Sequence, residues 1–114
     1  MEKIIIHTGD NHTEITINGD LNIHNIDILE NRFAELVEKA ERVKIIAINC
    51  ENLQSIDSSG LGILISFSKQ AEKKGISFYL CGLSKKVSAL FDISNLDRYF
   101  NIISMDEFRE IISQ

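Results

Sequence analysis

The chain has 114 residues, a formal net charge of −5 and 44% hydrophobic residues, which is typical of one globular domain over residues 1–114. Its lysine and arginine residues form no basic stripe, so nucleic acid is not an expected partner. The first apolar run is too short for a signal peptide and no run could span a bilayer. The sequence therefore predicts a cytoplasmic protein with no membrane partner.

Two β-strands are predicted at the start of the chain, over residues 3–8 and 13–18. The second alternates apolar and polar residues, as in a strand with one buried face. Turn-forming residues lie between them at 9–11, so the two strands are expected to form an antiparallel hairpin. A further turn is predicted at 18–20.

An amphipathic helix is predicted over residues 26–41, with Asn25 as its N-cap. Its apolar residues recur at helical spacing and are expected to face the core; they are Leu29, Phe33, Leu36, Val37 and Ala40.

The centre of the chain predicts a β-α-β unit. Residues 43–49 and 76–82 are nearly continuous apolar runs, as in strands covered on both faces, and a helix is predicted between them over 58–74. The sequence thus predicts an α/β fold in which a mixed sheet of four to five strands begins with an antiparallel hairpin and packs with about four helices.

The C-terminal part predicts a helix over 84–94 capped by Ser84, an edge strand within 99–104, and a last helix with a capping box. That box consists of Ser104 and Glu107. The apolar residues expected to face the core from these two helices are Val87, Leu90, Phe91, Phe108, Ile111 and Ile112.

No catalytic or metal-binding constellation is predicted. The histidines, His7, His12 and His24, share no helix face and have no cysteine or carboxylate at metal-ligand spacing. No phosphate-binding loop or nucleophile motif is present. Cys50 and Cys81 are expected to be reduced thiols. The sequence therefore favours a protein that is not an enzyme and has no metal or cofactor.

The segment SIDSSGLGILIS, residues 55–66, has more small polar residues than a helix start needs. Asp57 or Ser58 is the expected N-cap, yet all three positions 57–59 are polar. Helical spacing places Gly62 opposite the core and Ile63 at its rim or outside it, which suits a docking surface. The predicted core face of this helix consists of Leu61, Leu64, Ile65, Ser68 and Ala71. The alternative is that the polar residues only cap the helix.

Residues 47–66, AINCENLQSIDSSGLGILIS, resemble the signature of the anti-sigma factor antagonist family, whose fold is called the STAS domain. In that family a buried strand leads to the motif D-S-[ST]-G-L-G, which opens the second helix; here the motif occupies residues 57–62. The flanking segments 17–33 and 78–96 also resemble the family, so the likeness covers nearly the whole chain.

The resemblance implies a protein-binding switch. Unmodified members bind an anti-sigma factor that is also an ATP-dependent serine kinase, and this binding releases a sigma factor. The kinase inactivates the antagonist by phosphorylating the first serine of the motif, and a metal-dependent, PP2C-like serine phosphatase restores it. Carried onto this sequence, the phosphorylated residue is Ser58. The expected partner-binding residues are Asn22, Asp57, Ser58, Ser59, Gly60, Gly62 and Ile63.

Physical chemistry is consistent with a switch at this place. Phosphorylation adds roughly −1.5 to −2 charges, and a helix N-terminus favours anions, so the fold is expected to survive while the interface is lost. Gly60 and Gly62 are expected to leave room for a partner's backbone.

Two positions depart from the family's pattern. Asn22 replaces an aspartate in the turn before the first helix, which keeps the shape and removes the charge. If that charge assists the kinase, phosphorylation here is expected to be slower or to involve a different partner. Asn95 replaces a glycine, and asparagine is the next best residue for a left-handed helix end.

Two other function classes stay open. One is a scaffolding STAS domain, of the stressosome or lipid-transport type, without a sigma-releasing role; the intact motif argues against lipid transport and only mildly against the stressosome type. The other is a small-molecule binder or enzyme, for which the sequence shows no convergent polar residues.

Overall fold

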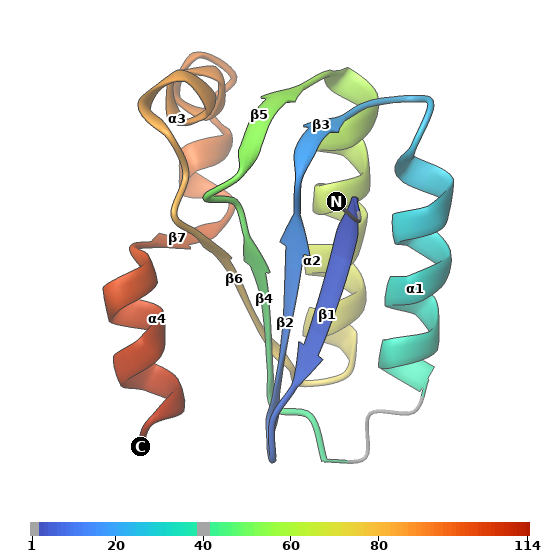
Figure 1. The fold of residues 1–114 in the computed structure, drawn as a ribbon, viewed down its shortest axis with the longest axis vertical. Helices are drawn as coiled ribbons and strands as arrows, with labels where there is room; N and C mark the ends of the chain where they lie inside the picture. The colour runs from blue at the N-terminus through green and yellow to red at the C-terminus, as the bar shows by residue number, and fades with distance from the viewer. Residues whose placement is uncertain (1–2, 39–41) are drawn as a thin grey trace.

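The computed structural model describes residues 3–38 and 42–114. Within them, the chain forms a five-stranded sheet of order β1-β2-β4-β6-β7 (Figure 1). The strands are β1 (Ile4–Thr8), β2 (His12–Ile17), β4 (Ile45–Asn49), β6 (Ser77–Cys81) and β7 (Asn101–Ile103). β1 and β2 pair antiparallel, and every other pair in this sheet is parallel. The predicted mixed sheet with an N-terminal hairpin is confirmed.

A second, two-stranded parallel sheet is an element that the sequence did not predict. It pairs β3 (Gly19–Leu21) with β5 (Leu53–Ile56), and Leu21 lies beside Ile56. The segment 18–20 was expected to be only a turn, and Gly19 does have the left-handed φ of 93° that a turn needs. The pair lies at the top edge of the molecule in Figure 1, where it leads into the two main helices.

Those two helices, α1 (Ile26–Glu38) and α2 (Ser58–Lys73), cover one face of the sheet (Figure 1). The rings of Phe33 and Phe67 stack between them with centroids 3.9 Å apart, and Phe78 of β6 meets Phe33 edge-on. Burial of these rings and of the aliphatic side chains around them supplies most of the stabilising free energy. Residues 39–41, predicted as the last turn of the first helix, lie outside the described residues.

The C-terminal part contains α3 (Lys85–Ile93), the 3-10 helix η1 (Leu96–Arg98) and α4 (Met105–Ile112). The predicted cap at Ser84 and the capping box of Ser104 and Glu107 are both present. Asn95 has the expected left-handed backbone, with φ 59°. The predicted inward position of Leu90 is wrong: that side chain is 36% exposed, because α3 buries only the narrow stripe of Val87 and Phe91.

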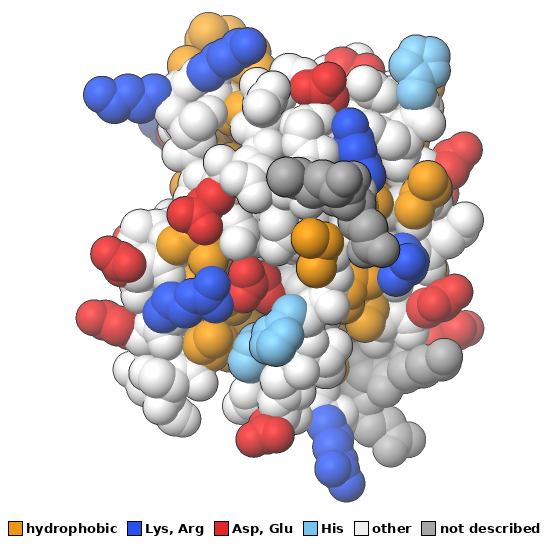
Figure 2. Space-filling model, in the orientation of Figure 1, with side chains coloured by type: hydrophobic (Ala, Val, Ile, Leu, Met, Phe, Trp, Pro, Cys, Tyr) orange, Lys and Arg blue, Asp and Glu red, His pale blue; other side chains and the backbone are white. Residues whose placement is uncertain are grey.

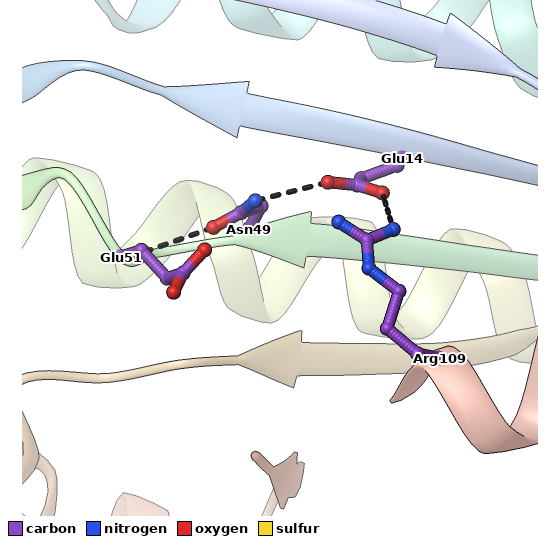
Figure 3. A network of polar contacts seen from close by, with 4 residues as sticks. All are labelled: Glu14, Asn49, Glu51 and Arg109. Carbon is purple, nitrogen blue, oxygen red and sulfur yellow. Dashed lines mark hydrogen bonds and ion pairs between the residues drawn. The ribbon is translucent and has the colours of Figure 1, made fainter. Parts of the chain in front are cut away.

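α4 covers part of the opposite face of the sheet, where Phe108 packs with Ala47 and Cys81. Arg109 of α4 reaches a buried carboxylate on this face, Glu14 of β2 (Figure 3). It accepts hydrogen bonds from Asn49 Nδ2 and from Arg109 Nη1, each 2.9 Å long. A buried carboxylate needs such partners, so this pair fixes α4 against the sheet.

The two cysteines are free and buried on opposite faces of the sheet. Cys50 belongs to the core under α1 and α2, whereas Cys81 lies under α4. Burial raises the pKa of each thiol from 9.0 to about 12, and the neighbouring Glu14 carboxylate adds to the effect at Cys81. The prediction of reduced thiols is confirmed. Among the described helices, none has the length and apolar character that crossing a membrane requires.

Candidate functional site

The site predicted from the sequence lies where β5 ends and α2 begins, at the top edge in Figure 1. Asp57, and not Ser58, is the N-cap of α2. Its Oδ1 accepts a hydrogen bond of 2.9 Å from the backbone N–H of Gly60. The backbone of Asp57 itself is extended, with ψ −176°, as is usual for an N-cap residue. Its other oxygen, Oδ2, accepts one of 3.2 Å from the N–H of Ile23. One carboxylate thus joins the start of α2 to the loop between β3 and α1.

The two serines are the first residues of α2, and their hydroxyl groups are not used in capping. Ser58 is exposed and Ser59 is half-buried. Within residues 3–38 and 42–114, the Ser58 hydroxyl makes no hydrogen bond with another side chain or with the backbone. The alternative that all three polar residues cap the helix is therefore wrong for Ser58, because Asp57 alone accepts from the first turn.

The two glycines of the motif differ from each other. Gly60 is buried, and a β-carbon there would lie 2.6 Å from the Ile56 side chain and 2.7 Å from the Leu21 carbonyl oxygen. Gly62 is exposed, and nothing lies within 4 Å of a β-carbon added to it. The expectation that both leave room for a partner is therefore wrong for Gly60, which allows α2 to approach the β3–β5 pair. Gly62 lies on the open surface.

The predicted position of Ile63 is also wrong. It was expected at the rim of the core or outside it, but only 7% of it is exposed and it packs in the main core. The buried stripe of α2 consists of Gly60, Ile63, Leu64, Phe67 and Ala71. Leu61 and Ile65, which were expected on the core face, are only partly buried. The face was misplaced because a buried glycine gives no apolar signal.

Asn22 lies in the loop between β3 and α1, and its side chain stabilises that loop. Its Oδ1 accepts from the N–H of His24, and its own N–H donates to Asn25 Oδ1, both at 2.9 Å. Asn25 also donates through Nδ2 to the carbonyl of Asp20, at 2.7 Å. Asn25, predicted to cap α1, therefore braces the loop instead.

The structure thus brings together, at one edge, the loop with Asn22 and the start of α2 with Asp57, Ser58 and Ser59. It adds Ile23, which sequence reasoning missed. Ile23 and Asp57 are separated by 34 positions, and the β3–β5 pairing that joins them has no periodic pattern in the sequence.

A cavity of about 540 Å³ lies away from this edge, beside α4, and is lined by residues that include Glu51, Gly82, Ser88 and Met105. The described residues also contain no group of three histidine, cysteine or acidic side chains placed to hold a metal ion. What the start of α2 offers is the exposed hydroxyl group of Ser58, which can be modified, and a surface that a partner can bind.

Comparison with known proteins agrees with the family resemblance noted in the sequence. The sequence matches the STAS domain family over residues 3–107. It is 26% identical over 105 residues to the anti-sigma-B factor antagonist of Bacillus subtilis, covering 92% of this chain and 94% of that protein. That relative is named as an antagonist of another factor and not for a reaction, in line with the expectation of a non-enzymatic protein.

Solved structures share the fold. A Thermotoga maritima structure described as that of a candidate anti-sigma factor antagonist has a TM-score of 0.85 at 26% identity, covering 97% of this chain and 95% of that one. The antagonist SpoIIAA in its unphosphorylated form has a TM-score of 0.81 at 20% identity, with 96% of each chain covered. Its phosphorylated form, from Bacillus, has a TM-score of 0.74 at 19% identity, covering 96% of this chain and 98% of that one. With its sequence matched over residues 3–107 and its fold shared with these structures, the chain belongs to the STAS domain family.

Proposed function

We propose that this protein is an anti-sigma factor antagonist whose binding is switched off by phosphorylation of Ser58. In this proposal the unphosphorylated protein binds an anti-sigma factor with serine kinase activity in the cytoplasm, which frees a sigma factor. The kinase transfers the γ-phosphoryl group of ATP to the Ser58 hydroxyl, and a metal-dependent, PP2C-like phosphatase removes it.

The observation that carries the proposal is that Asp57 caps α2 while the neighbouring Ser58 does not. The aspartate supplies the helix cap, through its bond to the Gly60 N–H, so the fold does not need the serine hydroxyl. The serine is exposed at the first turn, where a kinase can reach it. An exposed hydroxyl without a structural task is what a reversible modification site requires.

Electrostatics explains how the modification would act. A phosphate adds roughly −1.5 to −2 charges, and at the N-terminus of α2 the helix dipole offsets part of the repulsion from Asp57. The fold keeps its core, because the buried stripe of α2 points away from Ser58. A partner that covers this edge, however, would have to accommodate the charged phosphate group, so phosphorylation would make the free energy of binding less favourable.

The relatives support this choice over the alternatives. The similar protein SpoIIAA is described in an unphosphorylated and in a phosphorylated form, and the fold is recognisable in both. A scaffolding STAS domain, the second candidate, would keep the fold without a serine that must be modified. Ser58 is exposed, and its hydroxyl has no hydrogen-bond partner among the described residues, which favours the switch.

Phosphosite mapping tests the proposal. The anti-sigma factor kinases of the source organism would be purified one by one and incubated with the protein and ATP. We expect one of them to add a single phosphate, on Ser58, and Ser58→Ala to remain unmodified while the matched control Ser59→Ala is modified like the parent. A phosphate that maps to Ser59, or no modification by any of these kinases, would contradict the proposal.

A further inference from the structure

The loop between β3 and α1 presents an apolar side chain beside the start of α2. The side chain of Ile23 is apolar, yet it is 62% exposed and does not pack in the main hydrophobic core. A single exposed isoleucine is ordinary on a protein surface. What distinguishes this one is the way in which its backbone is held and the residue that holds it.

The loop is rigidly hydrogen-bonded. Three consecutive backbone N–H groups donate to side-chain oxygens: that of Asn22 to Asn25, that of Ile23 to Asp57, and that of His24 to Asn22. The carbonyl of Asn22 accepts from the N–H groups of Asn25 and Ile26. The backbone at Ile23 is therefore held in place, and little backbone conformational entropy is left to lose when a partner covers it.

Asp57 places that side chain at the switch. Its Oδ2 binds the N–H of Ile23 at 3.2 Å, while its Oδ1 binds the N–H of Gly60 at 2.9 Å, and Ser58 is the next residue. The carbonyl of Leu21 also accepts from the N–H of Asp57, at 3.2 Å, and joins the same two segments. The backbone of Ile23 is therefore hydrogen-bonded to the residue that precedes Ser58, and we expect a partner that covers Ser58 to reach Ile23 as well.

Resting on the proposed function, we propose that Ile23 is the apolar anchor by which the protein grips its anti-sigma factor, and that Asp57 is the residue that positions it. In the complex the Ile23 side chain fills an apolar pocket next to the groove that receives Ser58. Interface energy commonly concentrates in a few such buried side chains near the centre of a contact. Ile23 thus supplies affinity, while Ser58 supplies the control.

Binding of substituted proteins tests the anchor. The probe is each anti-sigma factor kinase of the source organism, purified and titrated by calorimetry. We expect Ile23→Ala to weaken binding tenfold or more at an unchanged melting temperature, and Ile23→Leu to bind within threefold of the parent. The matched control is Ile5→Ala, because Ile5 is also exposed, at 43%, but belongs to β1. It is expected to bind like the parent.

A crosslinking experiment gives a second readout that does not depend on affinity. Ile23→Cys can be labelled selectively with a photoactivatable maleimide, because Cys50 and Cys81 are buried. We expect light to crosslink the labelled protein to the kinase, and the Ile5→Cys control not to crosslink.

Two outcomes separate the anchor from the switch. If Ile23→Ala binds like the parent and Ile23→Cys does not crosslink, while Ser58→Asp fails to bind, the anchor is wrong and the proposed function stands. If Ser58→Asp also binds like the parent, the proposed function itself fails.

Discussion

The carbonyl oxygen of Leu21 faces the α-carbon of Gly60 so closely that a β-carbon on Gly60 would lie 2.7 Å from it. The start of α2 therefore lies against the β3–β5 pair, and the cap residue Asp57 donates its N–H to the same Leu21 oxygen, at 3.2 Å. The packing of α2 against the strands therefore requires glycine at position 60, whereas a β-carbon at position 62 would meet nothing within 4 Å.

The first prediction separates the two glycines. Gly60→Ala is expected to destabilise the protein by about 1–3 kcal/mol, because the methyl group meets backbone that cannot yield easily. Gly62→Ala is expected to be stabilising by about 0.5–1 kcal/mol, since alanine favours a helix interior and has open space there. Urea unfolding of both proteins measures the difference. Equal stabilities would show that α2 can shift without penalty.

The second prediction concerns the ion pair that fixes α4. Arg109→Ala is expected to destabilise the protein by about 1–3 kcal/mol, because Glu14 stays buried and, of its donors among the described residues, keeps Asn49 alone. Arg109→Lys, which keeps the charge, is expected to recover part of the loss. The measurement is again denaturant unfolding. An unchanged midpoint for Arg109→Ala would mean that the apolar packing around Phe108 holds the helix without the ion pair.

The third prediction concerns the thiols. Because burial raises the pKa of Cys50 and Cys81 to about 12, neither is expected to react with a thiol reagent at pH 8 until the protein is denatured. The unfolded thiols titrate near 9, so the folded chain retains protons that the unfolded chain releases. Stability is therefore lost as pH rises from about 9 towards 12. Rapid labelling of the native protein would contradict this.

Much of the fold could be predicted from the sequence, for identifiable reasons. The runs 43–49 and 76–82 are nearly continuous in apolar residues and give strong signals, as does the helical spacing of Leu29, Phe33 and Val37. The β3–β5 pair could not be predicted, because strands of three and four residues with polar members show no periodicity.

The candidate site was predicted as a motif but not as a surface. The D-S-S-G segment pointed to Ser58 and Asp57, and the structure places both at the start of α2. The positions of Ile63 and Gly60 were wrong because burial against β3 and β5 depends on pairing that the sequence does not reveal. The bond between Asp57 and Ile23 could not be predicted, for the same reason.

The fourth prediction concerns Asn22. Asn22→Asp is expected to change stability by no more than about 0.5 kcal/mol, because a carboxylate oxygen can accept from the His24 N–H as the amide oxygen does. If the family's negative charge assists the kinase, the same substitution speeds phosphorylation of Ser58. Initial rates with the purified kinase and ATP measure this effect. Equal rates would exclude position 22 from kinase recognition.

The most direct test of the switch is the affinity of Ser58→Asp for the purified anti-sigma factor kinase, measured by titration calorimetry with a thermal melt of the same sample. An uncompensated charge in an interface costs about 2–5 kcal/mol, so binding is expected to weaken roughly thirtyfold or more. The melting temperature should stay within a few degrees of the parent, and Ser58→Ala should bind normally and ignore ATP. If Ser58→Asp binds as tightly as the parent, the charge switch is wrong. If it unfolds instead, Ser58 has a structural role that Asp57 does not replace.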